Sequence, residues 1–188
     1  MVKPRPAGQP RMPPSTISVV AVTKLDRSRS RCVRAPAERL SALRDVLATA
    51  KQGYWAEQTE IQRQAVIAWA TRVEGRPEEA LALMLRAVEL EDKTEKHPVT
   101  PGPIVPPREL LGDMLLDMNQ ATQALQVFEA SMRGEPDRFH SVAGAARAAE
   151  LAGDGARARQ HYARLLTIAT TADGERPEVR RARAFLGR

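Results

Sequence analysis

Apolar side chains recur every three or four residues along most of the chain after residue 36, and this spacing predicts amphipathic α-helices. Residues 36–53 are predicted to form a leading helix that ends at Gly53, since glycine tolerates the left-handed conformation common after a helix. A longer helix is predicted over 54–74, and apolar stripes at 80–88, 110–118, 121–132, 142–149 and 158–169 indicate further helices, the first of which would start at Pro77. A last helix is predicted over 177–186. Short polar turns separate these helices, which makes sequential neighbours antiparallel. The predicted fold is therefore all-α and built from helix hairpins.

The segment 93–107 interrupts this pattern. Its five prolines fix φ and lack amide hydrogens, so it is predicted to be an extended loop rather than a helix; they are Pro98, Pro101, Pro103, Pro106 and Pro107. One interpretation is a spacer that lies over the surface between helical pairs. The other is an insertion that adds to a binding surface, as loops in helical arrays often do.

A fixed period connects the later helices. Ala124 and Ala158 are 34 residues apart, and Phe128 and Tyr162 are separated by the same distance along the chain. A small residue and an aromatic residue thus occupy matched points on two second helices. Such a period indicates repeated hairpins, each of which covers the apolar face that its neighbour leaves open.

The residues at this period resemble tetratricopeptide repeats (TPRs). Leu111-Gly112, Ala124, Phe128 and Pro136 fall at the Leu-Gly, Ala, Phe/Tyr and Pro positions of the TPR pattern. The resemblance covers about 54–172, with a degenerate repeat at 54–92 and repeats at 105–138 and 139–172, and implies a short right-handed solenoid, as in the C-terminal part of a longer bacterial-type TPR protein. The pattern departs at Arg108, Gln64, Leu115 and Thr71, where TPRs prefer Trp or Tyr, so a related hairpin repeat is the alternative.

Helices at 36–53 and 177–186 are expected to bracket the repeats. The second of these would be a capping helix, because three arginines would make its outer face polar; they are Arg180, Arg181 and Arg183. The first helix would expose an apolar face if the chain were a fragment of a longer array, and self-association would follow.

Charge is distributed unevenly along the 188 residues, whose formal net charge is +6. Residues 1–34 hold eight basic groups and only one acid, Asp26, so they carry +7, whereas the rest of the chain carries −1. The Pro-rich segment 1–35 is predicted to be a disordered basic tail, since its prolines oppose the amphipathic helix of an organelle-targeting peptide. Nucleic-acid binding through this tail is an alternative function, although no recognition motif supports it.

Catalytic, metal and cofactor motifs are missing from the sequence. Cys32 is the only cysteine, and His97, His140 and His161 lack partners at ligand spacing, so they are interpreted as surface residues. The sequence has no nucleophile elbow and no phosphate-binding glycine loop. Three carboxylates share one predicted helix face, which is interpreted as solvated; they are Glu109, Asp113 and Asp117. We therefore expect no enzyme activity, no metal and no cofactor.

The resemblance implies a groove lined by the first helix of each repeat. Carried over by position, the groove residues are Gln62, Trp69, Arg72, Glu109, Asp113, His140, Arg147 and Glu150. An acidic middle between Arg72 and Arg147 would suit a basic or mixed-charge segment, with Trp69 as an aromatic anchor or, equally, a core residue. The Lys and Asn of TPRs that grip a terminal carboxylate are missing, so no such clamp is expected.

The expected function is that of a non-enzymatic scaffold that binds a protein or peptide segment in this groove. The longest run of the tail without charge or strong polarity is Ile17–Val22, which is interrupted by Ser18. It is too short for a secretory signal or a membrane span, so a cytoplasmic protein without membrane contact is expected. The prediction of a basic or mixed-charge partner segment is based on the charges of the groove residues alone.

Overall fold

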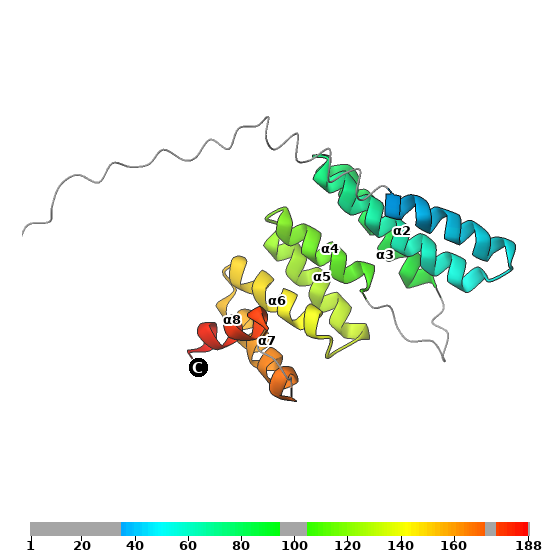
Figure 1. The fold of residues 1–188 in the computed structure, drawn as a ribbon. Helices are drawn as coiled ribbons and strands as arrows, with labels where there is room; N and C mark the ends of the chain where they lie inside the picture. The colour runs from blue at the N-terminus through cyan, green and yellow to red at the C-terminus, as the bar shows by residue number, and fades with distance from the viewer. Residues whose placement is uncertain (1–34, 95–104, 172–175, 188) are drawn as a thin grey trace, which may run out of the picture.

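The computed structural model describes residues 35–94, 105–171 and 176–187, and these contain helices and no strands (Figure 1). Residues 1–34 of the predicted tail and residues 95–104 of the predicted loop at 93–107 lie outside the described residues, while residue 35 already belongs to the leading helix. Residues 35–49 are helical and are called the leading helix below. The elements that follow are α2 (Gly53–Val73), α3 (Pro77–Lys93), α4 (Pro107–Asp117), α5 (Ala121–Gly134), α6 (Phe139–Leu151), α7 (Gly155–Ile168), a 3₁₀ turn η1 (Ala169–Thr171) and α8 (Pro177–Leu186).

The helices stack as hairpins in chain order (Figure 1). Each helix from α2 to α8 packs on the next one, and in addition α2 contacts α4 and α4 contacts α6. The first helices of the three hairpins therefore lie side by side and form one layer, and α3, α5 and α7 pack behind them. The all-α prediction is confirmed.

A residue in the left-handed conformation follows the leading helix, α2, α4 and α6; these residues are Lys51, Gly75, Asn119 and Gly153. The chain then reverses with a bond from the next amide to a carbonyl five residues back, such as Gln120 N to Leu115 O at 2.8 Å. Asn119 and Gly153 are 34 residues apart, so the turn repeats with the period of the core. The predicted helix end at Gly53 is wrong: Lys51 takes this role with φ of 57°, and Gly53 begins α2.

The core is centred on the residues that carry the 34-residue period. Ala124, Phe128, Ala158 and Tyr162 are all fully buried, which confirms the pattern of packing. The Phe128 ring lies between α4 and α6 against two glycines. A Cβ atom at Gly112 or Gly144 would lie 2.5 or 2.4 Å from the ring, so only glycine lets α4 and α6 approach it this closely.

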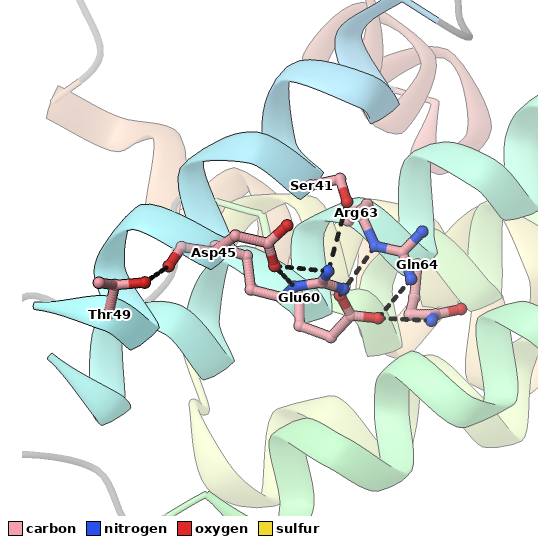
Figure 2. A network of polar contacts seen from close by, with 7 residues as sticks. Ser41, Asp45, Thr49, Glu60, Arg63 and Gln64 are labelled. Carbon is pink, nitrogen blue, oxygen red and sulfur yellow. Dashed lines mark hydrogen bonds and ion pairs between the residues drawn. The ribbon is translucent and has the colours of Figure 1, made fainter. Parts of the chain in front are cut away.

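The leading helix is held to α2 by a polar network around Glu60 (Figure 2). Arg44 Nη1 donates to Glu60 Oε2 at 2.8 Å, Arg63 donates to both carboxylate oxygens, and Gln64 Nε2 donates to Oε1 at 2.6 Å. These donors, Arg63 first, lower the pKa of Glu60 to about 2. The carboxylate is therefore charged at neutral pH and joins two helices.

Apolar side chains remain exposed at this end of the stack. Leu43 and Val46 of the leading helix are 49% and 63% exposed, and Trp55 at the start of α2 is 46% exposed. The side of the leading helix that faces α2 carries Arg44 and Ser41, so part of its apolar stripe points to solvent. Among the described helices, none has the length and hydropathy needed to cross a membrane.

Candidate protein-binding site

A cavity of about 280 Å³ opens between α4, α6 and α8, next to the first-helix layer. Its lining residues are Asp113, Leu116, His140, Ala143, Gly144, Arg147, Tyr162, Pro177, Glu178 and Arg181. Apolar groups come from α4, α6 and the Tyr162 ring, while charged groups come from α4, α6 and α8. The cavity thus combines an apolar lining with several charges, as ligand-binding surfaces do.

Asp113 and His140 connect α4 to α6 at this cavity. Asp113 Oδ2 lies 2.8 Å from His140 Nε2, and the imidazole also stands edge-on to the Phe128 ring at 6.2 Å between centroids. The hydrogen bond to Asp113 is the main cause that raises the pKa of His140, with smaller contributions from the charges of Glu109 and Glu178. Protonation of His140 therefore strengthens this contact between repeats.

Arg181 of α8 is fixed by Glu150 of α6. Its Nε and Nη2 atoms each donate to one Glu150 oxygen at 2.9 Å, and Tyr162 Oη donates to the same carboxylate at 2.5 Å. Arg181 accordingly lowers the pKa of Glu150, and burial is the first cause that raises the pKa of Tyr162 to about 12. This cluster joins α6, α7 and α8, so it positions one wall of the cavity.

Arg147, a second arginine that lines the cavity, differs from Arg181 in its contacts. It is exposed on α6 and forms no hydrogen bond or ion pair with another residue in the described part of the chain. Its electrostatic effect is a small lowering of the Glu150 pKa. All donors of this guanidinium are therefore available to a ligand, whereas Arg181 has most of its donors occupied.

Glu109 does not belong to the groove, which corrects the sequence-based assignment. Its side chain is 1% exposed, and its carboxylate accepts hydrogen bonds from Arg138 Nε at 3.1 Å and from the Ser141 hydroxyl. Arg138 is the residue before α6, so the buried carboxylate connects α4 to the start of α6. The prediction that Glu109 lies on a solvated face is wrong as well.

The three groove residues predicted on α2 lie away from this cavity. Arg72 Nη2 pairs with Asp117 Oδ2 at 2.8 Å, which connects α2 to α4. Trp69 is partly buried and packs against the core, and Gln62 is also partly buried. The structure thus brings together Asp113, His140 and Arg147 around the cavity, with Glu150 behind Arg181.

Three polar lining residues were not predicted as site residues from the sequence: Tyr162, Glu178 and Arg181. Arg181 was assigned to the outer face of a cap, whereas it reaches Glu150 on α6. The one sequence feature that points to Arg181 is its position four residues after Pro177, one turn inside the start of α8. Nothing in that spacing identifies α6 as its partner.

His161 is buried rather than on the surface, which corrects its interpretation. It is 7% exposed, and its Nε2 atom lies 3.3 Å from Glu129 Oε1 on α5. Arg157 Nη1 reaches the other oxygen of the same carboxylate at 3.5 Å. The described residues contain no group of histidine, cysteine and acidic side chains arranged to hold a metal ion.

Comparison with known proteins gives matches in structure only. No protein family and no characterised protein sequence matches the chain. Two crystal structures of a Podosopora anserina putative kinesin light chain with nearly identical TPR-like repeats, one of them a single-residue variant, align with a TM-score of 0.55 and 20% identity. The alignments cover 90% of this chain and 86% or 87% of the other. A MamA RS-1 double mutant aligns with a TM-score of 0.48 and 18% identity over 78% of this chain and 75% of its own.

The kinesin light chain alignments agree with the features found in the chain itself. Hairpins stack in order, the core repeats every 34 residues, and the first helices form one layer. The fold is a short solenoid of stacked helix hairpins, similar to that of TPR-like repeat proteins.

Proposed function

We propose that the protein is a non-enzymatic scaffold that binds a segment of another protein across α4, α6 and α8. The observation that carries this proposal is the cavity beside the first-helix layer, which combines an apolar lining with the charges of Asp113, His140 and Arg147. Stacked hairpins create extended surfaces that suit elongated protein segments. The fold thus supplies the surface, and the cavity supplies a place for a side chain.

The expected ligand is an extended segment of mixed charge. Neighbouring helices lie about 10 Å apart, so a segment that crosses three of them spans about 20–30 Å, or about six to nine residues at 3.3 Å each. Leu116 and Ala143 offer apolar contact at the cavity, while Arg147 and Glu178 offer charges of both signs at its rim. A purely basic segment fits less well, because Asp113 and Glu150 already have partners within the protein.

The test is selection of short random peptides on the intact protein, followed by binding measurements with variants. Ala143→Leu adds volume at the cavity and should weaken the selected peptides at least severalfold. Ala156→Leu makes the same change at an exposed site of α7 outside the cavity and should leave binding unchanged. Circular dichroism would check that both variants keep their helices. Peptides that bind both variants and the wild type equally would contradict the proposed site.

A further inference from the structure

The carboxylates beside the first-helix layer already have partners within the protein. Asp113 pairs with His140, Asp117 pairs with Arg72, and Glu150 binds Arg181 through both oxygens. Each of these pairs connects two different helices. Their charges are therefore used to hold the stack together, and they offer little to a positively charged ligand.

Arg147 is in the opposite situation. It lies exposed on α6 at the rim of the cavity, and no described acceptor binds its guanidinium. Glu150, one turn later on the same helix, is already occupied by Arg181 and Tyr162. Since a guanidinium is always charged and carries five donors, Arg147 presents a complete unused set of donors.

A second donor faces the same cavity. Arg181 uses Nε and Nη2 to hold Glu150 and Tyr162, and its Nη1 atom has no acceptor among the described residues. Its contacts fix the side chain, so this remaining donor is positioned in advance. The rim thus offers an anionic group the guanidinium of Arg147, which has no partner among the described residues, and one remaining donor of the fixed Arg181.

The lining beside these donors suits a side chain rather than a free ion. Leu116, Ala143 and the Tyr162 ring contribute apolar surface to the cavity. The cavity of about 280 Å³ is several times larger than the roughly 30 Å³ that a water molecule occupies. A carboxylate at the end of a short apolar stem matches both parts of the site.

From these contacts we infer that the bound segment places an internal aspartate or glutamate side chain at Arg147, with its stem over the cavity. This inference rests on the proposed function and specifies the chemistry of the partner. Arg147 would then determine the preference for an acidic side chain at one position of the ligand. Charge complementarity supports that choice, because Arg147 is an exposed cation of the cavity that has no partner among the described residues.

The probe is a set of short random peptides with amidated C-termini. Because amidation removes the terminal carboxylate, any carboxylate in these peptides belongs to a side chain. We expect acidic residues to be enriched at one position among peptides selected on the wild type. Arg147→Gln should reduce the affinity for these peptides about fivefold, as expected for one exposed ion pair. Arg147→Glu should reduce it more than about tenfold and, in a new selection, favour Lys or Arg at that position.

Arg159→Glu is the matched control, because it makes the same charge change at an exposed position of α7 outside the cavity. Unchanged acidic preference in this control would support the assignment. An acidic preference that survives Arg147→Glu, or selected peptides without acidic enrichment, would overturn it. In that case the proposed function still stands if Ala143→Leu weakens the same peptides. A wild-type protein that selects no peptide at all would overturn both.

Discussion

At its N-terminal end the stack holds the leading helix on α2 through charged side chains, whereas at its C-terminal end α8 is held by buried apolar contacts as well. Glu60 binds Arg44 and Arg63 at the first end, while Leu43 and Val46 stay exposed. At the second end, Val179 and Ala182 of α8 are buried. The Tyr162 and Phe185 rings lie 4.9 Å apart between centroids, and Arg181 binds Glu150 through two bonds.

The comparison shows that a helix can be placed at the end of a repeat stack in two ways. Polar pairs specify the orientation of a helix, but exposed pairs add little free energy because water competes for the same groups. Burial of apolar surface adds about 25 cal/mol for each square ångström removed from water. We therefore expect the C-terminal end to resist unfolding more than the N-terminal end, and the predictions below test this order.

The largest effect is expected for Tyr162→Ala. Tyr162 is 1% exposed, and its replacement removes the ring contact with Phe185 and the hydrogen bond to Glu150, so we expect a loss of about 3–5 kcal/mol in the free energy of unfolding. Trp55→Ala at the other end should cost less than about 1 kcal/mol because that ring is half exposed. Urea denaturation followed by circular dichroism measures both. Equal losses would contradict the proposed difference between the ends.

The next effect concerns Glu60 and acid. Glu60→Gln removes the carboxylate that Arg44 and Arg63 share, so we expect a loss of about 1 kcal/mol at neutral pH. The folded protein lowers the pKa of Glu60 from 4.5 to about 2, so this contribution is complete above pH 4.5 and is lost as the pH falls towards 2.

Urea titrations between pH 5 and pH 2 provide the measurement, and Glu60→Gln should make the free energy of unfolding depend less on pH in that range. Glu57→Gln on the same helix is the control, because Glu57 forms no ion pair within the described residues. An unchanged pH dependence in Glu60→Gln would show that the network does not stabilise this end.

A smaller effect is expected near neutral pH in the C-terminal half. The hydrogen bond to Asp113 raises the pKa of His140 above 6.5, so the stabilisation is complete below pH 6.5 and is lost as the pH rises through the raised value. Because the imidazole is about half exposed, we expect a change of about 0.5 kcal/mol. His140→Gln should remove it, as measured by thermal unfolding at pH 5.5 and pH 8. Acid would thus weaken the leading helix, and alkali the contact between α4 and α6.

The sequence predicted which residues are buried in this fold better than it predicted which charged residues pair with one another. The 34-residue period identified Ala124, Phe128, Ala158 and Tyr162, because burial in a repeat depends on spacing within each hairpin. The same positional argument selected both Glu109 and Arg147 for a groove.

Glu109 and Arg147 differ in the residues that surround them in the structure. Glu109 is buried because Arg138 and Ser141 reach it from the chain around the start of α6, whereas nothing in the described chain reaches Arg147. Such pairings depend on how far each helix is rotated about its own axis towards its neighbours. The 34-residue period of the sequence does not determine that rotation. For the same reason, the sequence placed Arg181 on an outer face although it binds Glu150.

The smallest effect on stability is expected from the exposed apolar residues of the leading helix. Changing Leu43 and Val46 together to Ser should alter the free energy of unfolding by less than about 0.5 kcal/mol per site, since about half or more of each residue is exposed. If this face mediates self-association, the double variant should sediment as a smaller species than the wild type at high concentration. Leu151→Ser removes an exposed leucine from the C-terminal half and should leave sedimentation unchanged. A wild type that sediments as a monomer at every concentration would show that the apolar surface at this end remains uncovered in solution.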